Sequence, residues 1–285
     1  MRATDRHRAS VWGTLAIIAA CSAALHADVT VVQTTTIEGG MAAMAGQTMS
    51  PKVTMRIKGL KSRSDVDAQI IQVSTIGDLS ARQVIVLRPD QKTAQILTIT
   101  TAVPTATDAS AGTAAAASAG ASVTPTGKSQ VIDGVKCDEY AFSTVMKMSD
   151  MNPGGSAMPP EAAEMMKGMQ MVMKGSVWVA KDLPGAADYL AYQKAAGSVD
   201  LGALMTGASG MSMPGMEKLM KAMGGIGGMA YLTEMTMTVE GTGQMAEMMQ
   251  QMGPMKITTK VTSITTDPIP DDVFKVPEGY TVIKQ

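Results

Sequence analysis

The chain has 285 residues and a formal net charge of −1, with 24 basic and 25 acidic side chains. The basic residues form no run and are not interleaved with aromatic residues, so nucleic acid is excluded as an expected partner. Both histidines, His7 and His26, lie near the N-terminus, which argues against imidazole catalysis and Cys/His zinc sites in the rest of the chain.

The first 27 residues have the features of an export signal. Three arginines lie within the first eight residues, and an apolar run follows at 11–25. This run is shorter than the roughly 20 apolar residues that span a membrane comfortably. We expect cleavage after Ala27, with Asp28 as the first mature residue. The product would be periplasmic or secreted, and peripheral to the membrane at most.

A second cleavage site is an open alternative. Residues 18–21, Ile-Ala-Ala-Cys, resemble the lipobox of bacterial lipoproteins, so Cys21 would become the lipid-bearing first residue. Cleavage after Ala27 removes both histidines and Cys21, and leaves 21 of the 24 basic and 24 of the 25 acidic residues, a balance of −3. Cys137 is then the lone cysteine, which we interpret as a small buried apolar residue.

The rest of the chain, residues 28–285, is predicted to be a single domain. Apolar and polar residues alternate in its first half, which is typical of antiparallel strands with one apolar face. Residues 88–91 form a predicted turn between two of these strands. The predicted strands cover 29–37, 53–58, 70–76, 84–87, 93–101 and 131–146.

Residues 102–129 interrupt this pattern. They are Ala, Gly, Ser and Thr with two prolines and almost no large side chain. Such a segment cannot bury enough surface to offset its ordering entropy. We interpret it as a flexible insertion within the domain, because strand-like sequence resumes at residue 130.

Methionine dominates the second half of the chain. All but five of the 28 methionines lie between Met146 and Met255, whereas Phe and Trp number two each. Two prolines and a glutamate at 159–161 predict a helix start, after which methionines recur every four residues at 165, 169 and 173. Further helices are predicted at 184–192, 216–223 and 245–252, and strands at 177–179, 231–240 and 256–266.

Three interpretations of the methionine stripes are open. Methionines at helical spacing against a sheet usually only pack, which would make this a structural envelope protein. Flexible thioethers also suit a yielding cavity for apolar ligands. This second interpretation predicts binding of a lipid or lipoprotein acyl chain, with a lining of Met165, Met169, Met216, Met220, Met223, Met235 and Met237.

The third interpretation is a Cu(I) site, because thioether is a soft metal ligand. Its candidate ligands are Met169, Met171, Met173, Met211, Met213 and Met216. No histidine supports such a site. In addition, Met169, Met171 and Met173 are expected to point to opposite faces of the element that they occupy. A metal is therefore only an alternative, and no cofactor is predicted.

No catalytic constellation is found in the sequence. The neighbouring acids at 138–139 and 271–272 would point to opposite faces of a strand, so they do not form a carboxylate pair. The glycine-rich run at 224–228 follows a predicted helix and precedes a strand, the reverse of a dinucleotide-binding loop. We therefore expect a protein that is not an enzyme.

Four segments together are similar to exported bacterial proteins of unknown function that we associate with the LolA/LolB-like superfamily of lipoprotein carriers. They are 58–63 (KGLKSR), 132–140 (IDGVKCDEY), 177–184 (VWVAKDLP) and 273–280 (VFKVPEGY). The resemblance implies an α+β fold in which a curved antiparallel half-barrel cradles three or four short helices. It also implies a cavity for acyl chains, and it makes Arg56 and Arg63 candidates for the arginine that acts in gating.

Overall fold

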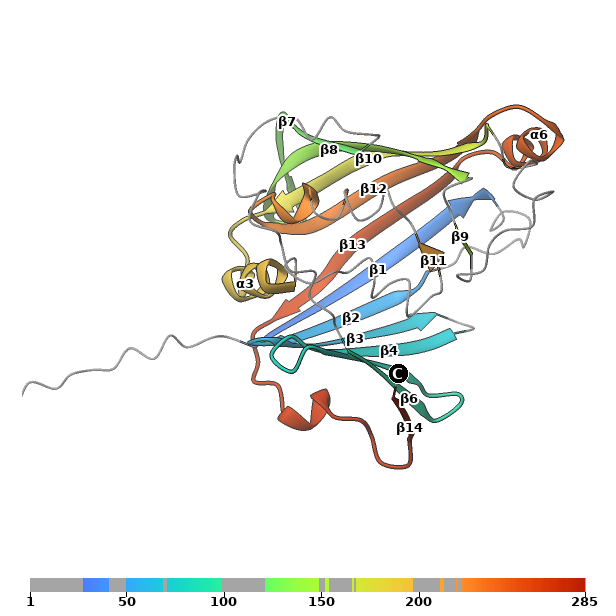
Figure 1. The fold of residues 1–285 in the computed structure, drawn as a ribbon. Coiled ribbons are helices and arrows are strands. Elements are labelled where there is room, and N and C mark those ends of the chain that lie inside the picture. The colour runs from blue at the N-terminus through green and yellow to red at the C-terminus, as the bar shows by residue number, and fades with distance from the viewer. Residues whose placement is uncertain are drawn as a thin grey trace, which may run out of the picture.

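The computed structural model describes residues 28–40, 50–68, 71–98, 121–148, 152–153, 166, 168–196, 211–212, 219 and 222–284. A twisted sheet of 12 strands dominates them (Figure 1), in the order β14-β6-β5-β4-β3-β2-β1-β13-β12-β10-β8-β7. Its strands are β1 (Val29–Gly39), β2 (Lys52–Lys58), β3 (Lys61–Ala68), β4 (Ile71–Asp78), β5 (Gln83–Arg88), β6 (Thr93–Thr98), β7 (Ala121–Ile132), β8 (Val135–Lys147), β10 (Gln170–Ala180), β12 (Met229–Glu240), β13 (Met255–Thr265) and β14 (Thr281–Lys284). The short strands β9 (Asn152–Pro153) and β11 (Met211–Ser212) pair separately.

The sheet is built around an antiparallel meander. Each strand from β1 to β6 pairs with the next. On the other side of β1 the sheet continues through β13, β12, β10, β8 and β7, again antiparallel. At the far edge, β14 runs parallel to β6, which makes the sheet mixed.

The predicted α+β fold, with a half-barrel that cradles three or four helices, is wrong. Among the described residues the helices are short: α3 (Ala186–Ala196), α6 (Gln244–Gln251) and the 3-10 helix η2 (Asp271–Phe274). Figure 1 shows α3 and α6 at opposite ends of the long strands. The architecture is that of a large mixed sheet with small helical additions.

The methionine spacing explains part of this error. Met173, expected in a helix with Met165 and Met169, lies in the strand β10. A spacing of four residues fits one face of a helix, but because four is even it also fits one face of a strand. Pairing of β10 with β8 on one side and β12 on the other decides in favour of the strand.

Several element predictions are confirmed to within a few residues. The strands expected at 29–37, 84–87, 231–240 and 256–266 correspond to β1, β5, β12 and β13, and the helices at 184–192 and 245–252 to α3 and α6.

The alternation of apolar and polar residues does not predict β3, whose residues are mostly Ser and charged, or the exposed β14. The prediction of a flexible insertion at 102–129 is wrong for residues 121–129, because they belong to β7. Residues 102–120 lie outside the described residues.

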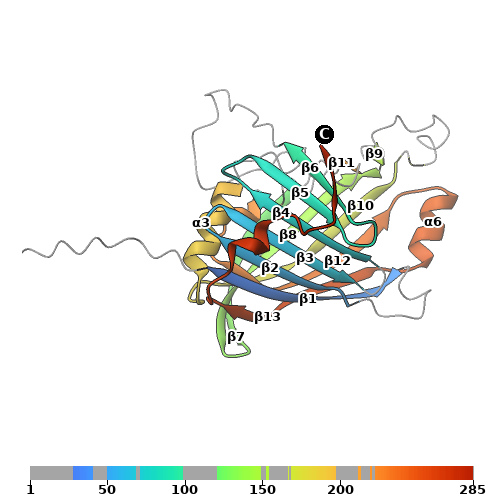
Figure 2. The same cartoon turned by 90° about the horizontal axis from the view of Figure 1, so that it is seen from below.

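Two segments pack on opposite faces of the β1–β6 half of the sheet. Ser62 and Arg63 are neighbours on β3, so their side chains point to opposite faces. The hydroxyl groups of Ser62 and Tyr192 of α3 lie 2.6 Å apart. Arg63 instead donates to the carbonyl oxygen of Val273, 3.1 Å away in η2. Figure 2 shows η2, part of the C-terminal strap (residues 266–280), lying over β3.

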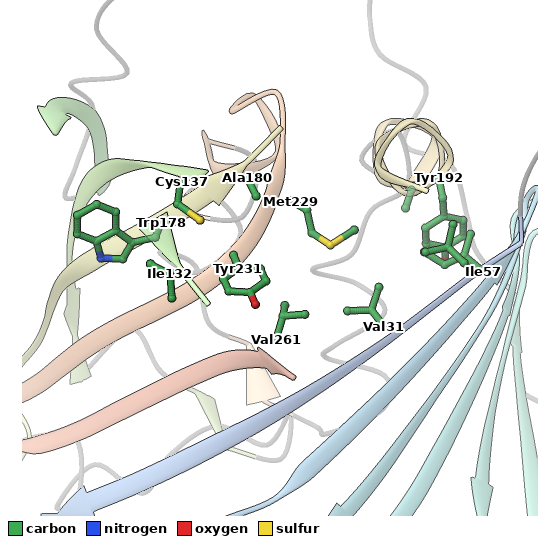
Figure 3. Packing of buried hydrophobic residues seen from close by; sticks show 12 residues of the cluster. Val31, Ile57, Ile132, Cys137, Trp178, Ala180, Tyr192, Met229, Tyr231 and Val261 are labelled. Atoms are coloured by element: carbon green, nitrogen blue, oxygen red, sulfur yellow. The ribbon is translucent and has the colours of Figure 1, made fainter. Parts of the chain in front are cut away.

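The largest apolar cluster joins the sheet to α3. Figure 3 shows Val31 of β1, Met229 and Tyr231 of β12, and Val261 of β13 between the strands and Tyr192 of α3. None of these side chains is more than 8% exposed. A second cluster joins the strap to the meander and contains Ile76, Leu87, Ala94, Ile269 and Phe274.

Candidate ligand-binding face

The pairing of β8, β10, β12 and β13 places methionines from distant parts of the chain side by side. Residues directly opposite each other in antiparallel strands point to the same face, with Cβ atoms about 4.5–5.5 Å apart. The central row is Thr144, Met173, Met237 and Met255; its neighbours are Phe142, Gly175, Met235 and Ile257 on one side, and Met146, Met171 and Val239 on the other. We call these three rows the methionine face.

The methionine face is closed at β8 and more open towards β13. Thr144 and Met173 are 0% exposed and Met146 is 4% exposed. Met237 and Met255, on the next two strands, are only half-buried. Met237 and Met255 therefore keep part of their surface in contact with solvent, on the side of β12 and β13.

Gly175 allows the rows to pack closely. A Cβ atom at this position would overlap the carbonyl oxygen of Glu234, and would lie 2.8 Å from Phe142 Cζ and 2.9 Å from Met235 Cα. Two of these three atoms belong to the backbone of β12, which cannot yield as a side chain can. The glycine thus keeps β12 against β10 and leaves room for the Phe142 ring.

Thr144 is the polar exception in the central row. Its Oγ1 atom is fully buried and has no hydrogen-bond partner in the described part of the chain. Its neighbours on this face are Phe142 and Met146 along β8 and Met173 across on β10. A buried hydroxyl group without a partner costs about 1–3 kcal/mol. The otherwise apolar central row therefore contains one hydroxyl group that makes no hydrogen bond within the described part of the chain.

The predicted ligand residues are only partly brought together. Met235 and Met237 lie on the methionine face. Met169 precedes β10 and packs with Ala246 of α6. Met223 belongs to the apolar cluster that also contains Met235. The remaining predicted residues, Met165, Met216 and Met220, lie outside the described residues.

Of the predicted copper ligands, the structure places Met171 and Met173 together on one face of β10. Met171 and Met173 are two residues apart in a strand and point to the same face, so the expectation of opposite faces is wrong. Met211 lies in β11, but its side chain is not described. Met213 and Met216 lie outside the described residues.

Thr144, Met146 and Met255 are among the residues of this face that the sequence patterns do not identify. Thr144 and Met146 share the alternation of Phe142 in β8, so this alternation could have identified them. The single strand expected at 131–146 is wrong, because residues 131–132 end β7 and a turn at 133–134 leads into β8. Met255 lies one residue before the strand predicted at 256–266. Only the strand pairing shows that these residues meet Met173 and Met237.

Of the predicted processing residues, Asp28 is described, whereas Ala27 and Cys21 lie outside the described residues. The Asp28 Oδ2 atom accepts a hydrogen bond from the backbone N–H of Ile269 at 2.6 Å and lies 3.8 Å from Lys58 Nζ. Asp28 therefore connects the start of β1 to the C-terminal strap. The cleavage site itself stays a prediction.

The two candidate arginines meet on a single carboxylate. Arg56 and Arg63 are paired across β2 and β3, on the face opposite to Met55 and Ile57. Arg56 donates to Asp65 Oδ2 at 2.5 Å, and Arg63 Nε donates to Oδ1 at 2.8 Å. Because Arg63 also donates to the carbonyl oxygen of Val273, the arginine pair connects β2 and β3 to η2 in the strap.

Asp65 gives the fold a pH dependence. Burial by itself raises the pKa of Asp65, but hydrogen bonds from Ser74 and Arg63 and the charges of both arginines outweigh burial and hold this pKa below its ordinary value of 3.8. A carboxylate whose pKa is lower in the folded than in the unfolded chain stabilises the fold above the unfolded pKa. That contribution is lost as the pH falls through the folded pKa.

We expect Asp65→Asn to lower the free energy of unfolding by about 1 kcal/mol at pH 7, after allowance for solvent screening at a partly exposed site. The difference from the parent chain should be smaller at about pH 3, because this pH lies below the ordinary pKa of 3.8, so the unfolded chain binds a proton there and part of the contribution of Asp65 is lost. Urea unfolding at both pH values measures this. Asp67→Asn, at an exposed position on the same strand, is the control. A loss that stays the same at both pH values would contradict the expectation.

The described residues contain no group of three or more His, Cys, Asp and Glu that could hold a metal ion, and no helix among them is long and apolar enough to cross a membrane. Cys137 is buried, and burial raises the pKa of its thiol, which disfavours the reactive thiolate.

No protein-family model and no curated protein sequence matches the chain. The resemblance to the LolA/LolB-like superfamily therefore stays a prediction.

Proposed function

We propose that this chain is a non-enzymatic protein of the bacterial cell envelope that binds an apolar molecule on the methionine face. The acyl chain of a lipid or lipoprotein is the class of ligand that fits best. The observation that carries the proposal is the row of Met173, Met237 and Met255 on three adjacent strands, in which Met173 is buried and Met237 and Met255 are half-buried. Export follows in the proposal from the signal-like segment at residues 1–27.

Methionine suits this role for a physical reason. Its unbranched side chain and polarisable sulfur adapt to ligands of different shape, which a rigid aromatic surface cannot do at the same cost. Half-buried apolar side chains gain about 25 cal/mol for each Å² that a ligand removes from water. Met235, Met237 and Met255 are half-buried, so each keeps some solvent-accessible apolar surface that a ligand could bury.

A triple substitution tests the proposal. Met235→Gln, Met237→Gln and Met255→Gln together keep the length of the side chains but make the face polar. We expect the Kd for a C12 to C16 fatty acid to rise by about tenfold or more, equivalent to about 1.4 kcal/mol. Displacement of a fluorescent apolar probe measures the Kd, and circular dichroism checks that the sheet is intact.

Two control variants accompany this experiment. Leucine at the same three positions should preserve binding to within about threefold, because the surface stays apolar. Met248→Gln on α6, where the side chain is 55% exposed and outside the face, should have no effect. An exported wild-type protein that carries no lipid in native mass spectrometry and binds no fatty acid would contradict the proposal.

A second candidate function is Cu(I) binding, favoured by one observation. Met237 lies directly opposite Met173 on one side and Met255 on the other, with Cβ atoms about 4.5–5.5 Å apart in each of these two pairs. Thioethers are ligands that suit Cu(I). The leucine variant separates the two functions, since it should keep acyl-chain binding but lose Cu(I). Anaerobic titration against a Cu(I) chelator measures the metal.

A further inference from the structure

We infer that the ligand of the methionine face is not a plain hydrocarbon but an acyl compound whose carbonyl oxygen accepts a hydrogen bond from Thr144. This inference rests on the proposed function and makes it more specific. It starts from the buried Thr144 hydroxyl group, which has no partner in the described part of the chain.

Packing alone does not explain a threonine at this position. Thr144 is 0% exposed and lies between Phe142 and Met146 along β8, with Met173 opposite. Valine has the same branched shape, favours strands and leaves no polar group unsatisfied. A buried hydroxyl group without a hydrogen bond makes the ligand-free protein less stable. A ligand that supplies an acceptor would restore the hydrogen bond and so regain this free energy on binding.

The central row also defines how such a ligand would lie. From Thr144 the row crosses β10 and β12 to Met255 on β13, which is about 14 Å at the usual spacing of adjacent strands. The carbonyl group would lie at the closed end of the face and the hydrocarbon chain would run over Met173 and Met237 towards the open end. The flexible thioethers of Met146 and Met173 flank the hydroxyl and can swing aside to admit the carbonyl group.

The test compares probes of the same chain length that differ in their polar end. Methyl laurate, lauric acid and dodecane are titrated against the wild-type chain, Thr144→Val and Thr144→Ser, by displacement of a fluorescent apolar probe. We expect Thr144→Val to raise the Kd for methyl laurate and for lauric acid by about fivefold to tenfold. The Kd for dodecane should stay within about twofold of the wild-type value. Thr144→Ser, which keeps the hydroxyl group, should retain binding of all three probes.

The two oxygen-bearing probes distinguish the source of the carbonyl group. Preference for methyl laurate supports an esterified lipid or lipoprotein acyl chain, and preference for lauric acid supports a free fatty acid. Thr144→Val should also raise the melting temperature of the ligand-free protein, because it removes an unpaired hydroxyl group, and this shows that the variant folds.

Two results would overturn the inference in different ways. If Thr144→Val weakens dodecane as much as methyl laurate, or weakens neither, the hydroxyl group does not contact the ligand. The proposed apolar-ligand function would survive that result. If the wild-type chain binds none of the three probes, both the inference and the proposed function fail.

Discussion

Gly175→Ala is expected to destabilise the folded chain by about 3 kcal/mol, at the upper end of the usual cost of overpacking. The added methyl group would overlap the carbonyl oxygen of Glu234 and lie 2.9 Å from Met235 Cα, so the backbone of β12 must move. The central strands β10 and β12 would then separate. Because Met235 and Phe142 flank this position, the variant should also weaken binding of acyl chains.

Gly227→Ala is the matched control for this experiment. A Cβ atom at Gly227 would meet no atom within 4 Å, so its effect on stability should be small. Urea unfolding followed by circular dichroism gives the free energy of unfolding for both variants. Similar stabilities of the two variants would show that β10 and β12 are not packed as closely as described.

Phe274→Ala is expected to cost about 3–5 kcal/mol, the usual range for removal of a buried phenylalanine side chain. Phe274 is 8% exposed and packs with Ile76, Leu87, Ala94 and Ile269 in the cluster beneath the meander. The strap follows β13 and leads to β14, so its release should also free the edge strand from β6. Hydrogen exchange should then show faster exchange in β6 and β14 than in β10.

Polar contacts hold the same strap but should contribute less than Phe274. Lys58 Nζ donates to the carbonyl oxygen of Ile269 at 2.7 Å and lies 2.8 Å from Asp271 Oδ1, at a largely exposed position. Exposed ion pairs contribute little to stability, because solvent screens the two charges. Val282→Ala on β14, where the side chain is 47% exposed, is the apolar control and should change stability little. A loss as small for Phe274→Ala as for Val282→Ala would contradict burial of the strap.

Local patterns in the sequence determine much of the secondary structure. In β12, Met235, Met237 and Val239 alternate with polar residues, and this period of two is sufficient to predict a strand with one apolar face. Pro184 before an apolar segment is sufficient to predict the start of α3. These predictions succeed because the information lies within a few consecutive residues.

Only the tertiary structure decides which of these residues meet. Thr144, Met173, Met237 and Met255 are far apart in the sequence, and pairing of four strands is required to bring them into one row. The even spacing of Met165, Met169 and Met173 fits a helix and a strand equally, and neighbouring strands resolve this at Met173. The parallel pairing of β14 with β6 also depends on the path of the strap, because no local pattern encodes which strand lies next to another.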